Sequence, residues 1–206
     1  MPNTKTTVKT NTTPNSIKEV ELNAVTFRTL WDNYATGNPY DDPTGEYRNQ
    51  CAIRMSVTLH RVGIEMKSFS QKLVKPAPGK QTIGRILIGG KATATRADEM
   101  SDWLKLKPFT GLQKPENVTG SDWKFRISGR TGIIAFKNYW RRDGERDASG
   151  GHIDLWNGSR ITISGPASLV GSVGRSLGIE SAHVPGTDIG YSDLSKATEI
   201  LFWEIR

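Results

Sequence analysis

The sequence contains a single cysteine, Cys51, among its 206 residues. An intramolecular disulfide is therefore excluded, and folding does not depend on an oxidising compartment. No stretch approaches the roughly 20 apolar residues of a membrane-spanning helix, and residues 1–16 lack the apolar core of a secretory signal. We expect a protein that folds in a reducing cytoplasm, does not insert into a membrane, and leaves the cell, if it does, without a signal peptide.

Long runs of positive charge are also absent, although the net charge is +7 and the pI is about 9.6. No run of Lys and Arg exceeds two residues, no spacing matches a zinc finger, and aromatic residues do not alternate with basic ones. We therefore predict no nucleic-acid partner and no metal site or cofactor. A basic field attracts polyanions, including an acidic cell-wall polymer; a solvated basic surface without a dedicated ligand explains the charge equally well.

The chain has no internal period, which excludes a solenoid. Residues 1–16 are polar and predict a disordered tail. Residues 17–206 suffice for a single domain, in one compact body or two lobes. The 21 Gly and 10 Pro predict a loop-rich, mixed structure rather than a helix bundle.

Helical patterns dominate the first half. An apolar stripe at helical spacing predicts a helix over residues 23–34 that ends at Gly37; its members are Phe27, Leu30, Trp31 and Tyr34. Asn49 predicts the N-cap of a second helix that runs to about Arg61 and is apolar on two sides, as a central helix is. Thr95 with Asp98 resembles a capping box that opens a third helix.

Strand patterns dominate the second half. A polar, glycine-bearing turn separates residues 132–137 from residues 152–157, so these two strands predict a hairpin. Further strands are predicted at residues 83–88, 160–164 and 200–205. Helices followed by antiparallel strands are typical of the α+β class.

Cys51 has two interpretations. A lone cysteine on an apolar helix face is usually a small buried hydrophobe. A cysteine in the first turn of a helix, however, lies where free N–H groups and the helix dipole stabilise a thiolate. As a nucleophile, Cys51 still needs a histidine partner.

Three histidines are available as that partner. His60 lies nine residues after Cys51 on the same helix, on the opposite face and roughly 13 Å along the axis, so it is excluded. His183 lies in a loop without a fixed element. His152 opens a strand after Gly150 and Gly151, which leave room for a substrate backbone or a neighbouring side chain, and we favour His152.

The sequence does not decide which residue orients the His152 ring. Alternate residues of a strand share a face, so Asp154 points the same way as His152 and can orient its ring. Neighbouring side chains on one face often diverge, and the orienting group commonly comes from the next strand. Asp154 is therefore either the third catalytic residue or a structural acceptor.

A cysteine that opens a central helix, followed by a hairpin with histidine at its second strand, resembles the layout of papain-like cell-wall peptidases of the NlpC type. Residues 49–56 (NQCAIRMS) and 151–158 (GHIDLWNG) resemble the two signature blocks of type VI secretion amidase effectors, family four. Residues 132–140 resemble the strand before the second block, and the stripe from Phe27 to Tyr34 resembles the family's first helix. The resemblance spans about residues 22–165.

This resemblance implies a papain-like α+β fold and a toxin made in the bacterial cytoplasm. The toxin would pass through type VI secretion components and cleave the γ-D-glutamyl–meso-diaminopimelate bond of peptidoglycan stem peptides in the periplasm of a rival cell. A cognate immunity protein is the implied partner. Cys51 matches the nucleophile and His152 the base. The family's downstream carboxylate has no direct match, so Asp154, Asn157, Ser164 or a residue of the tail fills that role.

Two alternatives remain for the function. A non-catalytic papain-fold module could bind cell wall or a partner protein, and a basic nucleic-acid binder would show steep salt dependence. Candidate cations for the substrate's carboxylates are Arg48, Arg54, Lys137 and Arg160. Residues 166–199 carry no pattern that indicates a function.

Overall fold

The computed structural model describes residues 5–9, 17–21, 24–47, 49–140, 150–162 and 194–206. Its helices are α1 (Phe27–Asp32), α2 (Cys51–Arg61), α3 (Ala97–Lys105), α4 (Trp123–Arg126) and the 3-10 helix η1 (Leu194–Lys196). Its strands are β1 (Lys5–Lys9), β2 (Ile17–Glu21), β3 (Arg85–Ile88), β4 (Lys91–Ala94), β5 (Glu116–Asn117), β6 (Gly132–Trp140), β7 (Gly150–Trp156) and β8 (Glu199–Glu204). All the pairings are antiparallel, and the main helices precede the main sheet, so the predicted α+β class is confirmed.

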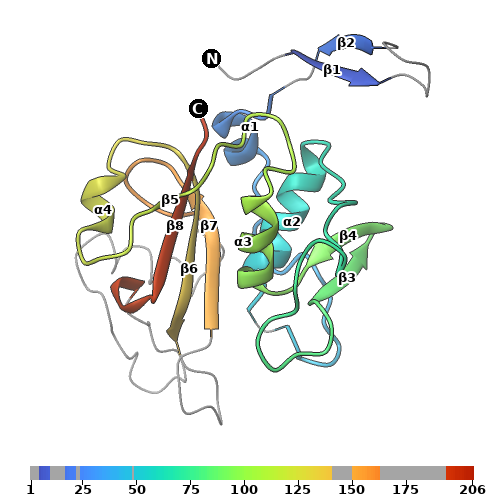
Figure 1. The fold of residues 1–206 in the computed structure, drawn as a ribbon. Coiled ribbons are helices and arrows are strands. Elements are labelled where there is room, and N and C mark those ends of the chain that lie inside the picture. Colours follow the sequence, from blue (N-terminus) through green and yellow to red (C-terminus); the bar gives the residue numbers. More distant parts are fainter. Residues whose placement is uncertain (1–4, 10–16, 22–23, 48, 141–149, 163–193) are drawn as a thin grey trace.

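The main sheet has the strand order β5-β8-β6-β7. The predicted hairpin is confirmed as β6 and β7, and the predicted final strand is β8, which pairs with the other side of β6. Among the described strands β7 therefore lies at an edge, beside α2 and α3 (Figure 1). An edge strand has N–H and C=O groups that the sheet does not use, so β7 can bond to other elements.

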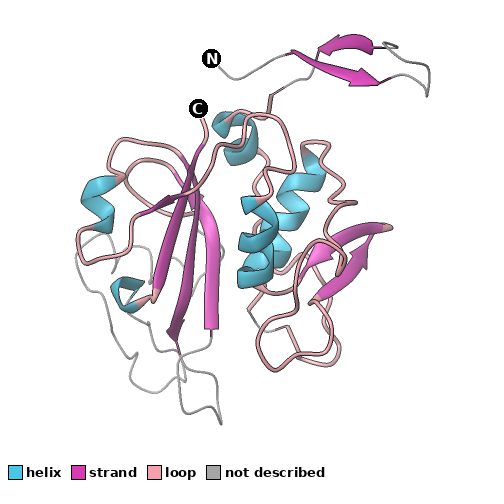
Figure 2. Cartoon of the chain, viewed as in Figure 1, coloured by secondary structure: helices cyan, strands magenta, loops and turns pink. Residues whose placement is uncertain are grey.

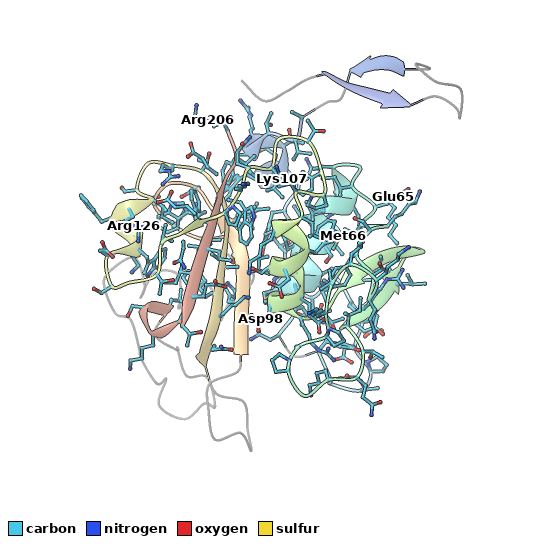
Figure 3. All side chains as sticks on the ribbon, viewed as in Figure 1. Glu65, Met66, Asp98, Lys107, Arg126 and Arg206 are labelled. Atoms are coloured by element: carbon cyan, nitrogen blue, oxygen red, sulfur yellow. The ribbon has the colours of Figure 1, made fainter. Side chains whose placement is uncertain are left out.

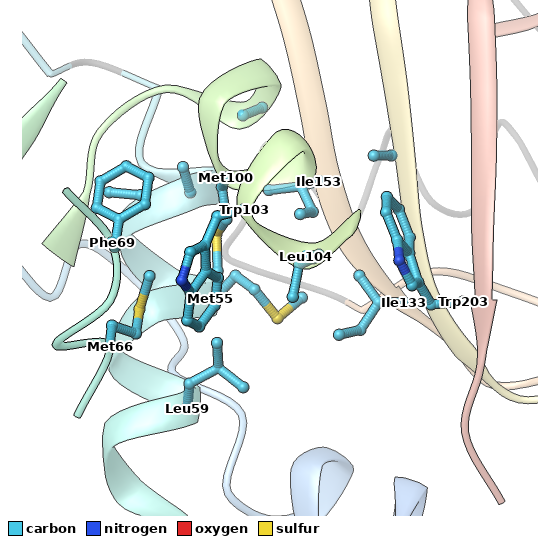
Figure 4. Close-up of a cluster of buried hydrophobic side chains, with 14 of the residues drawn as sticks. Met55, Leu59, Met66, Phe69, Met100, Trp103, Leu104, Ile133, Ile153 and Trp203 are labelled. Atoms are coloured by element: carbon cyan, nitrogen blue, oxygen red, sulfur yellow. The ribbon is translucent and has the colours of Figure 1, made fainter. Parts of the chain in front are cut away.

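The two faces of this sheet pack into different cores. One face meets the helices, where strand and helix side chains interlock (Figure 4); the buried residues there include Met55, Leu59, Met100, Leu104, Ile133, Ile153 and Trp203. The other face packs against α4, where Trp123 makes edge-to-face contacts with Phe136 and Trp156. Since strand residues alternate between faces, His152, which lies opposite Phe136, is on the α4 face.

Helix α2 is central, as its two apolar sides predict: nine of its eleven residues are buried. Two buried hydroxyls on α2 also hold its neighbours. Thr58 Oγ1 accepts from Ala35 N (3.0 Å), and Ser56 Oγ accepts from Ala94 N (3.0 Å). The helix is thus tied to the segment after α1 and to β4, which fixes the position of its first residue, Cys51.

Helix α1 is shorter than predicted. Thr26 caps it by accepting from Thr29 N (3.2 Å). It ends at Asn33, whose side-chain amide donates to Thr29 O (2.9 Å). Gly37, predicted to end the helix, lies in the following loop with a φ of +68°.

The predicted capping box of Thr95 and Asp98 is wrong. The N-cap of α3 is Arg96, whose side chain makes no capping hydrogen bond to the helix backbone and pairs instead with the carboxylate of Glu99 (2.7 Å). Thr95 instead prolongs the hairpin of β3 and β4, because its N–H donates to Gly84 O (2.8 Å). The backbone of Thr95 is therefore committed to the hairpin before the helix begins.

Three other segments differ in part from what the sequence predicts. The strand predicted at residues 83–88 is β3, and it pairs with the unpredicted β4 through a turn of two glycines that both have positive φ. Within residues 160–164, the described part makes one bridge, between Trp156 and Ile161. Residues 5–9 of the segment predicted to be disordered form β1, where Thr and Val favour a strand; the division into tail and domain stays a prediction.

No described helix is both long and apolar enough to cross a bilayer.

Candidate active site

Cys51 is the first residue of α2. The N-cap is Gln50 and not Asn49 as predicted, and Asn49 is exposed. The Gln50 amide holds both backbone groups of Tyr40, accepting from its N–H (3.1 Å) and donating to its carbonyl (2.9 Å). The backbone just before Cys51 is thus fixed by a bond to a preceding loop rather than by a side-chain cap.

The sulfur of Cys51 lies between α2 and the edge of β7. Cys51 is 4% exposed and is hydrogen-bonded to His152 and to the backbone N–H of Ile153. The first intrahelical bond of α2 runs from Arg54 N to Gln50 O (2.8 Å), so the preceding N–H groups have no intrahelical partner. These N–H groups and the helix dipole favour a thiolate over a thiol.

His152 lies in β7 opposite Phe136, with the two ring centroids 6.4 Å apart, and its side chain is 13% exposed. Its Nε2 is 3.3 Å from Oδ2 of Asp154. Because Nε2 faces Asp154, the nitrogen that meets the Cys51 sulfur is Nδ1. The structure therefore brings together Cys51 and His152, which the sequence favoured, and Asp154, one of the candidates for the third residue.

The carboxylate of Asp154 is buried and divided between two tasks. Its Oδ1 accepts from Leu155 N (2.8 Å) and from the hydroxyl of Thr162, while Oδ2 faces His152. Thr162 is held beside β7 because its N–H donates to Leu155 O (3.2 Å). These bonds turn the carboxylate toward the histidine ring, so the two neighbouring side chains do not diverge.

The surroundings of Cys51 and His152 favour the charged form of each side chain. Burial raises the pKa of the Cys51 thiol, but the hydrogen bond and charge of His152, the Ile153 N–H and the charge of Arg54 together lower that pKa below its usual value. Burial also opposes charge on His152, but its bonds to Asp154 and Cys51 raise its pKa to about 9. Both shifts favour a thiolate–imidazolium pair at neutral pH.

Arg54 is a second cation near the sulfur, three residues after Cys51 on α2. It is 9% exposed, and its Nη1 donates to Gly37 O (3.1 Å). Among the described residues, its Nε has no hydrogen-bond partner and no carboxylate pairs with the guanidinium. A buried cation is costly without an anionic partner, which makes Arg54 a candidate for a carboxylate of a ligand.

The other candidate cations are placed differently. Lys137 is bound to Asp102 (3.3 Å) and Glu199 (3.2 Å). Arg160 lies over the ring of Trp31, 5.7 Å from its centroid. Arg48 lies outside the described residues.

Gly151 gives α3 its close approach to β7. A Cβ at Gly151 would collide with Oδ1 of Asp98, and would lie 3.1 Å from its Cγ and 3.3 Å from Cβ of Ala97. Figure 3 labels Asp98 where α3 approaches β7. The sequence left two roles open for Gly150 and Gly151, which were to make room for a substrate backbone or for a neighbouring side chain. Gly151 has the second role, because it makes room for Asp98.

The remaining candidates do not join the site. His60 is buried, with Nε2 2.9 Å from Ala92 O, which agrees with its predicted exclusion. Asn157 accepts from Ser159 N (3.1 Å) and Arg160 N (2.9 Å) through Oδ1, so this oxygen is used by the turn after β7. His183 and Ser164 lie outside the described residues.

Sequence reasoning missed Gln50, Thr162 and the N–H of Ile153. Gln50 and Thr162 act through partners 10 and 8 residues away, and no local pattern signals such a bond. The Ile153 N–H could have been found only from the position of β7 at the sheet edge.

Comparison with known proteins gives one family. Residues 47–203 match the family model of Tae4, described as type VI secretion system (T6SS), amidase effector protein 4. Among solved structures, the chain is similar to the type VI effector Tae4 from Enterobacter cloacae, at 19% identity over 88% of this chain and 96% of that one, with a TM-score of 0.49.

Two solved effector–immunity complexes are similar to this chain to about the same degree. The effector–immunity complex Tae4–Tai4 from Enterobacter cloacae matches at 20% identity over 88% of this chain and 98% of that one (TM-score 0.49). The Tae4–Tai4 complex from Salmonella Typhimurium matches at 21% identity over 89% of this chain and 100% of that one (TM-score 0.48). No curated protein sequence matches the chain significantly.

Proposed function

This chain belongs to the Tae4 family of type VI secretion amidase effectors, and on that premise we propose that it is a cysteine amidase that cleaves the γ-D-glutamyl–meso-diaminopimelate bond of peptidoglycan. The observation that carries the proposal is the chain of contacts from Cys51 through His152 to Asp154. A non-catalytic binding module would have no use for a thiolate paired with an imidazolium.

Cys51 acts as the nucleophile. Its thiolate attacks the carbonyl carbon of the scissile amide, and a C–S bond forms as the carbonyl oxygen becomes negative. N–H groups at the start of α2, including that of Cys51, stabilise this oxyanion, since no helical bond uses them. The same helix end therefore lowers the energy of the thiolate and of the tetrahedral intermediate.

His152 is the proton donor and then the base. Its imidazolium, with a pKa of about 9, protonates the leaving amine of diaminopimelate as the C–N bond breaks. The neutral ring then takes a proton from water, whose oxygen attacks the thioester and releases Cys51. Asp154 keeps Nε2 engaged, so the ring presents Nδ1 to the sulfur throughout.

The setting of the reaction follows from the family. An effector of type VI secretion is delivered into a target cell, and we propose that this chain acts on peptidoglycan in the target's periplasm. Solved Tae4 effectors are held by Tai4 immunity proteins. We propose that the producing cell protects itself with a cognate immunity protein that covers the site around Cys51.

The test is hydrolysis of purified muropeptides, with products identified by mass spectrometry. We expect a new amine at diaminopimelate with the unsubstituted chain and no product with Cys51→Ala or Cys51→Ser, since serine lacks a comparably acidic group. Circular dichroism of both variants should match that of the unsubstituted protein. Undiminished cleavage by Cys51→Ala would end the nucleophile assignment, and cleavage at a different amide would end the bond assignment.

A further inference from the structure

The positive charge of the chain is concentrated in one segment. Residues 66–97 contain seven of the 28 Lys and Arg and none of the 21 Asp and Glu. The rest of the chain thus has 21 residues of each sign, and the whole net charge of +7 resides in these 32 residues. We call residues 66–97 the basic segment.

Most cations of the basic segment are exposed. Lys67 and Arg96 form ion pairs with flanking acids, Glu65 (2.5 Å) and Glu99 (2.7 Å). The exposed residues Lys72, Lys75, Lys80 and Arg85 have no ion-pair partner among the residues that the structure describes. Repulsion among uncompensated like charges opposes folding. Neutral residues at these positions would make the folded state at least as stable, so stability does not explain these cations.

The basic segment is held together as a unit. It comprises the loop from Met66 and the hairpin of β3 and β4, on the side of α2 away from the main sheet (Figure 1). Within it, the Gln71 side chain donates to Gln81 O (3.3 Å). This bond brings the stretches that carry Lys72 and Lys80 together, although they are separated by a loop containing two prolines.

The basic segment is anchored beside the catalytic residues. The buried Glu99 of α3 accepts from Ala77 N (2.8 Å) and Gly84 N (2.5 Å), which fixes the loop between Lys75 and Arg85 to the first turn of α3. The preceding residue, Asp98, lies against Gly151, next to His152. One helical turn thus connects the exposed cations to the candidate site.

From this arrangement we propose that the basic segment is a second contact surface for peptidoglycan. It binds carboxylates of neighbouring stem peptides electrostatically while one stem peptide occupies the site at Cys51. The proposal rests on the proposed function, because it takes the substrate to be the cell-wall polymer. That polymer presents a carboxylate-bearing stem at each repeat. Such a row of carboxylates matches several separate exposed cations better than a single compact anion would.

The composition of the segment disfavours nucleic acid as the ligand. Single-stranded nucleic acid is held by aromatic rings on which bases stack. The only aromatic residue in the basic segment, Phe69, is buried against Trp103 with the two rings nearly perpendicular. Exposed lysines without aromatic neighbours fit an anionic polymer recognised by charge alone.

The experiment is co-sedimentation with purified insoluble peptidoglycan sacculi. The Cys51→Ala protein is used so that the polymer stays intact, with the quadruple variant Lys72→Gln, Lys75→Gln, Lys80→Gln, Arg85→Gln in the same background. The matched control changes four other exposed cations, Arg28, Lys107, Lys114 and Arg206, to Gln. Both quadruple variants lose the same net charge, so a difference between them reports position and not total charge.

We expect binding of the basic-segment variant to weaken about tenfold, and that of the control about twofold or less, because exposed ion pairs each contribute little but four act together. Binding of the Cys51→Ala protein without further changes should also weaken as salt rises, since exposed charges are screened. Equal binding by the two quadruple variants, or binding that is insensitive to salt, overturns the proposal. Binding to single-stranded DNA that exceeds binding to sacculi overturns it as well.

A second readout separates this proposal from the proposed function. With Cys51 present, the ratio of sacculus hydrolysis to soluble-muropeptide hydrolysis should fall in the basic-segment variant relative to the control. If no protein hydrolyses either substrate, the proposed amidase fails, while the sedimentation result still decides the contact surface. If hydrolysis occurs and the ratio is equal in the two variants, the contact surface fails and the amidase stands.

Discussion

Nε2 of His152 lies 3.3 Å from Oδ2 of Asp154, two residues further along the same strand. The contact exists because Thr162 and Leu155 N hold the other carboxylate oxygen. It accounts for much of the raised pKa of His152 and leaves Nδ1 for Cys51. In the proposed mechanism, Asp154 is the third residue and orients the His152 ring.

We predict that Asp154→Asn lowers kcat for muropeptide hydrolysis about 10- to 100-fold, because a hydrogen bond to a charged group contributes ~1.5–3 kcal/mol. The alkaline limb of the pH profile should move to lower pH, since the imidazolium loses its carboxylate partner. Asp122→Asn, an exposed change, is the control and should leave both quantities unaltered. An unchanged pH profile in Asp154→Asn would assign Asp154 a structural role.

The proposed ionic pair of Cys51 and His152 predicts a pH range for activity. The His152 pKa is raised, so the imidazolium persists below about pH 9 and is lost as the pH rises through that value. The Cys51 pKa is lowered, so the thiolate persists above that depressed value and is lost as the pH falls through it. We predict a plateau of kcat/KM between these limits.

Thiolate absorbance in the ultraviolet can measure this pair directly, because Cys51 is the only cysteine. The difference between the unsubstituted chain and Cys51→Ala should show thiolate at neutral pH. In His152→Ala the titration should move up toward the ordinary thiol pKa of about 8.5. A thiol that titrates at its ordinary value in both proteins contradicts the pair.

Gly151→Ala should reduce activity by pushing α3 and β7 apart. The new methyl group would meet Asp98 and Ala97, and the strand carries His152 at the next position, where displacements of an ångström cost about 100-fold. Asp98→Ala removes part of the obstruction, so the double variant should recover activity relative to Gly151→Ala. Additive losses in this double-mutant cycle would show that the steric contact is not the cause.

His60→Ala should lower stability and leave activity nearly unchanged. The His60 ring bonds to Ala92 O in the interior, so its removal should lower the free energy of unfolding by ~1–3 kcal/mol. Its distance from Cys51 along α2 predicts kcat/KM within about twofold of the unsubstituted value. Denaturant unfolding and muropeptide hydrolysis on the same preparation measure the two effects, and a large loss of kcat/KM with unchanged stability would be inconsistent with this role.

The sequence alone determined the local features of this protein. The apolar stripes and glycine turns identify α2, the hairpin of β6 and β7, and β8, because these elements depend on residues near in the chain. The same local geometry excludes His60 and places Cys51 in the first turn of a helix. Cys51 and His152 could therefore be predicted as partners before any fold was known, and the two signature blocks indicated the family.

Only the tertiary structure decided how these parts are held. Gln50 displaced Asn49 as the N-cap because Tyr40 lies within reach, and Thr162 turned Asp154 toward His152 because the chain folds back along β7. The Ile153 N–H reaches the sulfur because β8 takes the other side of β6 and leaves β7 at the edge. Each of these bonds joins elements whose separation is set by packing, and no periodicity in the sequence encodes that distance.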